Sequence, residues 1–171
     1  VESQLTISPG LIQIFNEILV NAIDRQYKGT SGREMSEIRI TVDPKVGEIS
    51  IWNDGGAIPI EEKEPGLYVP TLVFGEFLSG DNFDDTKVRF TGGRNGVGAK
   101  ATNAYSKAFE VTIDDPGSGK RFFQRWERNM AKLLEPEITT SDVKHGHGSV
   151  LVSFRPDLAR FGLKRIDQDH M

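Results

Sequence analysis

Residues 9–26 decide the fold of this chain, and they read PGLIQIFNEILVNAIDRQ after a serine at position 8. Ser8 followed by Pro9 is typical of a helix N-cap and first turn. Apolar side chains then recur at helical spacing, at Leu11, Ile14, Phe15, Ile18, Leu19 and Ala22. We therefore expect an amphipathic helix over residues 9–26, with one face buried against the rest of the domain.

The polar arc of this helix carries Gln13, Glu17, Asn21 and Asp24, and it has no lysine or arginine. A solvated helix face usually mixes charges of both signs, whereas this arc offers only carboxylate and amide oxygens. Such oxygens suit Mg²⁺ and an ordered water, with Asn21 binding the metal and Glu17, one turn away, accepting a proton from the water. Asp24 is then placed to orient one of these groups. The alternative interpretation is an acidic surface stripe.

The remaining hydrophobic patterns predict a mostly antiparallel sheet backed by helices. Alternating isoleucine and valine side chains on both sides of a turn at residues 43–47 predict a β-hairpin. Helices are expected at residues 68–78 and 98–107, and further strands near residues 109–113, 122–126 and 150–154. Because strands and helices do not alternate along the chain, a doubly wound parallel sheet is disfavoured. The expected fold class is α+β, a two-layer α/β sandwich.

Charge is unevenly distributed between two neighbouring segments. Residues 60–85 carry seven acids and one lysine, whereas residues 86–107 carry five cations and no acid. Four of the seven residues from Gly92 to Gly98 are glycine. Bare backbone N–H groups and cationic side chains can converge on one polyphosphate, so a triphosphate site is expected here. A solvated loop is the alternative, and neither a dinucleotide fingerprint nor a Walker loop fits the surrounding sequence.

Composition limits the classes of function. The 171 residues are 37% hydrophobic and 27% charged, which favours a folded domain. A formal net charge of −4 argues against a domain-wide nucleic-acid surface, which needs clustered lysine and arginine. No apolar run is long enough for a membrane span, and the absence of cysteine excludes disulfides and thiol chemistry. We expect residues 1–171 to be a single domain cut from a longer protein.

Several segments together resemble the GHKL ATPase superfamily, named for gyrase, heat-shock chaperone, histidine kinase and MutL. Within that superfamily the chain resembles DNA topoisomerase II of the eukaryotic type. The segments are FNEILVNAID at residues 15–24, GGRNGVGAK at residues 92–100 and FRPDL at residues 154–158. The resemblance extends over nearly the whole chain and is weaker for bacterial gyrase. It implies a Bergerat fold, in which ATP binds between helices and sheet under a lid.

The resemblance also implies roles for individual residues in an ATP site that holds magnesium. Glu17 is the expected general base that activates water, Asn21 is the expected Mg²⁺ ligand, and Asp24 is a neighbouring polar group of the site. Asn53 is expected to read the adenine amine, with Ile58 in the purine pocket. The sugar and phosphates are expected to contact Asn82, Gly93, Arg94, Asn95, Gly96, Val97, Gly98, Ala99 and Lys100.

By this resemblance, the chain is the ATP-binding and ATP-hydrolysing domain of a nuclear type II DNA topoisomerase, an isomerase that passes one duplex through another. DNA binding and homodimer formation are expected of the full-length protein. This chain alone, which lacks the following transducer domain, is expected to be monomeric and to hydrolyse ATP slowly or not at all. Two alternatives stay open: a nucleotide-dependent switch like gyrase, the chaperones or MutL, and a binding-only pseudo-ATPase. Ala57, Asp81 and Val150 depart from the family pattern and favour the second alternative.

Overall fold

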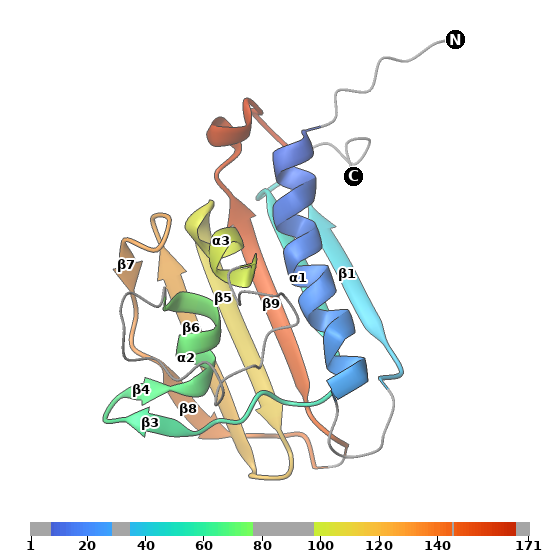
Figure 1. The fold of residues 1–171 in the computed structure, drawn as a ribbon, viewed down its shortest axis with the longest axis vertical. Coiled ribbons are helices and arrows are strands. Elements are labelled where there is room, and N and C mark those ends of the chain that lie inside the picture. Colours follow the sequence, from blue (N-terminus) through green and yellow to red (C-terminus); the bar gives the residue numbers. More distant parts are fainter. Residues whose placement is uncertain (1–7, 29–34, 77–97, 145, 167–171) are drawn as a thin grey trace.

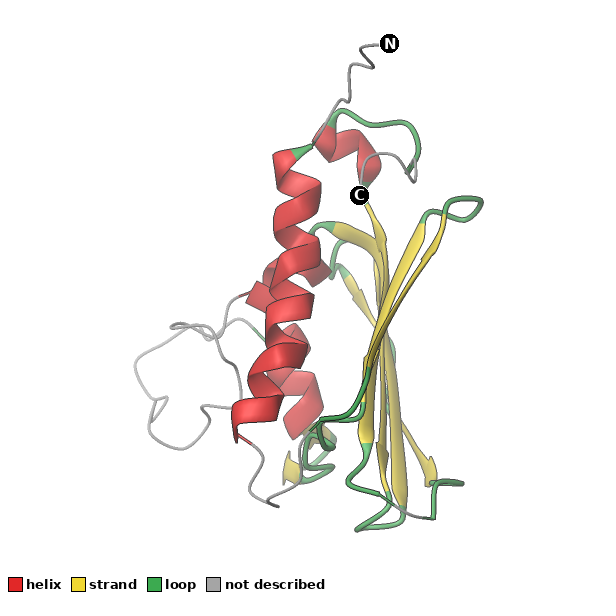
Figure 2. Cartoon of the chain, turned by 90° about the vertical axis from the view of Figure 1, so that its right-hand side faces the viewer, coloured by secondary structure: helices red, strands yellow, loops and turns green. Residues whose placement is uncertain are grey.

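The computed structural model describes residues 8–28, 35–76, 98–144 and 146–166. Among these residues, seven strands form one antiparallel sheet, and β3 (Glu62–Glu64) and β4 (Leu67–Tyr68) form a separate pair. Figure 2 shows the α-helices of the described segments on one face of this sheet, so that helices and sheet form two layers. The predicted two-layer α/β sandwich with a mostly antiparallel sheet is therefore confirmed.

The order of the sheet places strands that are distant in sequence side by side (Figure 1). β1 (Ile38–Asp43) and β2 (Glu48–Asn53) form the predicted hairpin at one edge, and β2 pairs next with β9 (Ser149–Pro156). β9 pairs with β5 (Ser106–Asp115), which forms a hairpin with β6 (Lys120–Glu127). The short strands β7 (Lys132–Leu133) and β8 (Glu137–Thr140) both pair with β6.

In the part of the chain that the structure describes, three α-helices cover the sheet: α1 (Pro9–Lys28), α2 (Val69–Gly75) and α3 (Gly98–Ala104). A 3-10 turn, η1 (Leu158–Phe161), follows β9. α1 begins as its sequence predicts, because the Leu11 amide donates to Ser8 Oγ at 3.5 Å and the Ile12 amide donates to the Ser8 carbonyl at 3.1 Å. Within the described segments, every helix is too short or too polar to cross a membrane.

The hydrophobic core lies between α1 and the central strands. Ile14 and Ile18 are 5% and 2% exposed, on the face of α1 that carries the predicted apolar stripe. A row of paired residues, Ile51, Val152 and Val111, crosses three strands beneath the helices, and each of these side chains is buried. Burying one such side chain contributes about 1.5–3 kcal/mol, so this layer fixes α1 on the sheet.

Some predicted boundaries were wrong for reasons that lie in the tertiary structure. The helix expected at residues 98–107 ends at Ala104, because residues from Ser106 onward pair with β9 instead. The helix expected at residues 68–78 begins at Val69 and is described as far as Gly75. β3, β4, β7 and β8 were not predicted, since strands of two to four residues are too short to produce a period.

Candidate functional site

The acidic arc of α1 and the end of the glycine-rich segment meet at the interface between α1 and α3. Gly98, the first residue of α3, lies so close to Glu17 that a β-carbon added to Gly98 would be 1.9 Å from Glu17 Oε2. On its own helix, Glu17 Oε1 accepts a hydrogen bond from Gln13 Nε2 at 2.7 Å. The carboxylate of Glu17 is thus held between its own helix and the backbone of α3.

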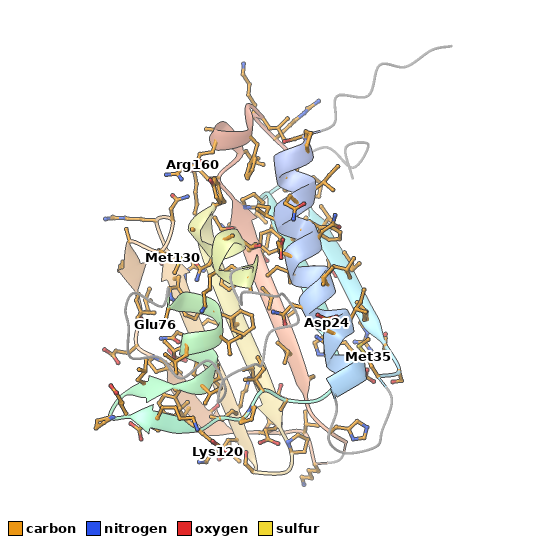
Figure 3. All side chains as sticks on the ribbon, viewed as in Figure 1. Asp24, Met35, Glu76, Lys120, Met130 and Arg160 are labelled. Carbon is orange, nitrogen blue, oxygen red and sulfur yellow. The ribbon has the colours of Figure 1, made fainter. Side chains whose placement is uncertain are left out.

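Lys100 follows Gly98 by two residues on α3 and is only 7% exposed. Burial lowers the pKa of Lys100 from its usual value, while the carboxylate of Glu76, just after α2, acts in the opposite direction. Figure 3 labels Glu76 at the end of α2 and Asp24 on α1, two helices that cover the same face of the sheet. An ammonium group withdrawn from water in this way is stabilised by any anion that binds beside it.

A small cavity brings together two amide side chains that the sequence places on different elements. Its volume is about 10 Å³, room for one water molecule, and it lies between α1, the sheet and the end of α2. Asn53 is 2% exposed; its Oδ1 accepts a hydrogen bond from the Gly55 amide at 3.2 Å, and its Nδ2 donates to the Val150 carbonyl at 3.5 Å. The cavity is lined by Ile18, Asn21, Ala22, Ile51, Asn53, Phe74, Val150 and Val152.

The other predicted site residues fall into two groups. Asp24 is half-buried on α1, and Ile58 is 2% exposed within the hydrophobic core. Ala99 is also buried, beside Lys100 on α3. The remaining predicted contacts of sugar and phosphate lie outside the residues that the structure describes: Asn82, Gly93, Arg94, Asn95, Gly96 and Val97.

Asp54 follows Asn53 at the end of β2, and its carboxylate hydrogen-bonds to the segment before β1. Its Oδ1 accepts hydrogen bonds from the Ser36 and Glu37 amides, both at 2.9 Å, and its Oδ2 accepts one from the Ser36 hydroxyl. Partial burial by itself raises the pKa of Asp54, but these hydrogen bonds outweigh it and hold the pKa below its usual value.

The lowered pKa of Asp54 predicts a pH-dependent contribution to stability. A carboxyl with a depressed pKa stabilises the fold above its unfolded-state pKa, and this stabilisation is lost as the pH falls through the folded-state value. The unfolding free energy of Asp54→Asn, measured by urea denaturation, is expected to be lower than that of the unchanged chain at pH 7. This difference in unfolding free energy between the two proteins is expected to shrink below about pH 4, where carboxyls gain protons. A gap that stays constant with pH would contradict this account.

The turn after Asn53 is packed tightly against the start of β9. The Ala57 amide donates to the His147 carbonyl at 3.1 Å, and a β-carbon on Gly148 would be 2.7 Å from the Ala57 β-carbon. The β-carbon of Ala57 is therefore accommodated by the glycine opposite it. Gly148 also has a positive φ of +92°, a conformation that residues with a side chain rarely adopt.

Gly148→Ala is expected to lower the free energy of unfolding by about 2 kcal/mol, because both the φ angle and the backbone contact are unfavourable for alanine. The added methyl group would be 2.4 Å from the Asp114 carbonyl oxygen, a backbone atom that cannot rotate away. Urea denaturation measures the loss. Gly47→Ala is the matched control, since Gly47 has a φ of +67° and nothing within 4 Å of an added β-carbon. Equal losses for both variants would contradict a steric role for Ala57 and Asp114.

Two site-forming residues were missed by sequence reasoning. Thr102 and Asn103 on α3 are both fully buried, and each donates a side-chain hydrogen bond to the backbone of another helix. The available signal was two adjacent polar residues in an alanine-rich helix, immediately after the glycine-rich segment.

Two further observations concern the described segments outside the contact between Glu17 and Gly98. A larger groove of about 750 Å³ is lined by parts of β5, β6, β9 and η1 and contains none of the predicted nucleotide-binding residues. No group of three or more histidine, aspartate or glutamate side chains in the described segments could hold a metal ion by itself.

Comparison with known proteins gives one family and one architecture. The chain is 44% identical over 162 residues to DNA topoisomerase 2 of Penicillium chrysogenum, an alignment that covers 94% of this chain and 10% of that protein. It superimposes on the ATPase region of Saccharomyces cerevisiae topoisomerase II with a TM-score of 0.82 and 40% identity, over 99% of this chain and 44% of that one. The chain thus spans about a tenth of the length of its curated relative.

Bacterial gyrase is the more distant match, as expected. The 43K ATPase domain of Thermus thermophilus gyrase B has a TM-score of 0.69 and 23% identity, over 96% of this chain and 38% of that chain, a likeness of fold alone. The family model described as "Histidine kinase-, DNA gyrase B-, and HSP90-like ATPase" matches residues 6–158. This match covers most of the chain, including α1, α3 and β9, and the chain therefore belongs to that ATPase family.

Proposed function

We propose that this chain binds ATP at the interface between α1 and α3 and hydrolyses the bond between the β- and γ-phosphates of the nucleotide. The contact between Glu17 and Gly98 carries the proposal, because it brings a carboxylate from α1 to the helix that bears the buried Lys100. A base on α1 and a cation on α3, about 80 residues apart in the sequence, are thus carried by two helices in direct contact, and triphosphate hydrolysis uses groups of both kinds. The alternative interpretation, an acidic surface stripe on α1, does not require a contact between Glu17 and α3.

Glu17 is the proposed general base. One oxygen of its carboxylate accepts from Gln13, and the other faces Gly98, which leaves lone pairs for the proton of a water molecule. As the water proton moves to Glu17, the water oxygen bonds to the γ-phosphorus, the bond from that phosphorus to the bridging oxygen breaks, and ADP and phosphate result. Hydrogen bonding to Gln13 and contact with Gly98 limit the rotamers of Glu17, so the base is oriented before ATP binds.

Lys100 is the proposed cation for the triphosphate. Its ammonium is poorly solvated in the described structure, so a phosphate oxygen beside it would replace missing water contacts. Asn53 and Ile58 are proposed for the adenine, with Asn82 and residues 93–99 completing the sugar and phosphate contacts. Asp24 is proposed to orient a group of the same site.

The side chains present fit a magnesium ion bound mainly by the substrate. Mg²⁺ takes oxygen ligands, keeps several waters and needs few protein ligands when phosphates are bound. Asn21 supplies an amide oxygen on the same arc of α1 as Glu17 and is the proposed ligand. When bound, the ion would neutralise phosphate charge. Glu17 and Lys100 act on the water and the phosphates as described above.

For the whole protein, we propose ATP-driven passage of one DNA duplex through another, on the basis of its similarity to topoisomerases 2. DNA is proposed to contact other parts of that protein, since this chain has a net charge of −4. The whole protein is proposed to form a homodimer. A nuclear location is proposed on the same similarity, and a monomeric state for the chain by itself.

Calorimetric titration of the chain with a non-hydrolysable ATP analogue and Mg²⁺ tests the binding proposal. Saturable binding of one analogue per chain, weaker for the corresponding GTP analogue, is the expected result. No heat of binding at millimolar analogue would contradict it. ATP hydrolysis by the whole protein, with and without duplex DNA, separates the alternatives. Stimulation by DNA supports the topoisomerase, unstimulated turnover supports a switch, and binding without turnover supports a pseudo-ATPase.

A further inference from the structure

A buried hydrogen bond joins α3 directly to the backbone of α1. Thr102 is fully buried, and its Oγ1 donates to the Ile14 carbonyl of α1 at 2.8 Å. The Gly98 carbonyl, one turn back on α3, is a second acceptor at 3.4 Å, but it is the longer contact. Because the Ile14 carbonyl is also within an α-helix, it does not depend on Thr102 for a hydrogen-bond partner. The threonine hydroxyl is therefore an addition that ties two helices together.

This hydrogen bond lies next to the contact between Gly98 and Glu17. Thr102 is four residues after Gly98, and Ile14 is three residues before Glu17, so each pair occupies one face of its helix. The two contacts, Thr102 with Ile14 and Gly98 with Glu17, run in opposite chain directions, so α3 lies antiparallel to α1 at this point. Together they fix the register of α3 along α1. A small slide of α3 would change both at once.

We infer that Thr102 is a positioning residue for the proposed hydrolysis: its hydroxyl sets the register of α3 on α1 and so holds Gly98 against the Glu17 carboxylate. The inference rests on the proposed function of Glu17 for its catalytic consequence only. Thr102 is buried and cannot contact substrate, so it acts through Gly98 and Glu17. Sub-ångström placement of a base affects the rate of water attack more strongly than it affects nucleotide binding, which involves many other contacts.

Thr102→Val tests the inference, because valine keeps the branched shape and removes only the hydroxyl. In the whole protein, the single-turnover rate of ATP hydrolysis is expected to fall on the order of 10-fold, while the affinity for a non-hydrolysable ATP analogue changes by less than about threefold. Thr102→Ser restores the hydroxyl and is expected to recover most of the rate. Ser106→Ala is the matched control. It removes another buried hydroxyl bond, from Ser106 Oγ to the Thr102 carbonyl at 2.7 Å, without touching α1.

An NMR measurement tests the same inference without any turnover. Introduced into the unchanged chain, Glu17→Gln is expected to shift the amide signal of Gly98, because it removes the charge that lies beside that residue. Thr102→Val is expected to reduce the shift by at least half, and Ser106→Ala to leave it intact. A full shift in Thr102→Val, or an equal loss in Ser106→Ala, would overturn the positioning role. Failure of the unchanged chain to bind the analogue would instead overturn the proposed function. The NMR measurement would still decide whether Thr102 positions Gly98 beside Glu17.

Discussion

In the whole protein, Glu17→Gln is expected to bind ATP with nearly the affinity of the unchanged protein and to hydrolyse it roughly 10²- to 10⁴-fold more slowly, the usual contribution of a general base. Glutamine has the same shape and can still accept the hydrogen bond from Gln13 Nε2. It cannot take a proton from water. Single-turnover hydrolysis and calorimetric titration with a non-hydrolysable analogue measure the two quantities separately.

A second Glu→Gln substitution controls for a general effect of lost charge. Glu48 lies on β2, where it pairs with Arg155 of β9 at 3.2 Å. Glu48→Gln is expected to leave both binding and hydrolysis unchanged. If Glu17→Gln hydrolysed ATP as fast as Glu48→Gln, Glu17 would not be the base. Loss of binding in Glu17→Gln would place Glu17 among the ligand contacts instead.

Gly98→Ala is expected to reduce hydrolysis on the order of 10²-fold while leaving the domain folded, because the added methyl group displaces the proposed base. The methyl carbon would be 1.9 Å from Glu17 Oε2 and 2.8 Å from its Cδ, so the carboxylate must rotate away. These atoms are the end of a flexible side chain, and alanine is a better helix former than glycine. The unfolding free energy is therefore expected to change by less than about 1 kcal/mol.

Gly162→Ala serves as the control, because it is expected to lower the free energy of unfolding and to leave hydrolysis unchanged. Gly162 ends η1 with a φ of +70°, and no atom lies within 4 Å of an added β-carbon. Alanine there costs about 1 kcal/mol of backbone strain and should not alter hydrolysis. Urea denaturation and single-turnover assays on both variants give the comparison. Full hydrolysis by Gly98→Ala would mean that the Glu17 carboxylate does not need its position beside α3.

The candidate site was predicted unevenly, and particular residues show why. Glu17 and Asn21 could be selected from the sequence because they lie on one helix, where spacing alone decides which side chains share an arc. Lys100 could be selected by its charge and its glycine-rich neighbours, but its burial could not. Thr102 gave no comparable signal, since its importance depends on an acceptor 88 residues away in the sequence.

The sequence by itself determined which faces are buried and where the main elements lie, because periods of 3.6 and 2 residues are properties of the local backbone. It thereby determined α1, the hairpin of β1 and β2, and the acidic arc that includes Glu17. Tertiary structure decided which elements meet: β9 between β2 and β5, Gly148 against Ala57, and Gly98 against Glu17. These contacts depend on how side chains of distant segments fill a shared space, and no local period encodes that complementarity.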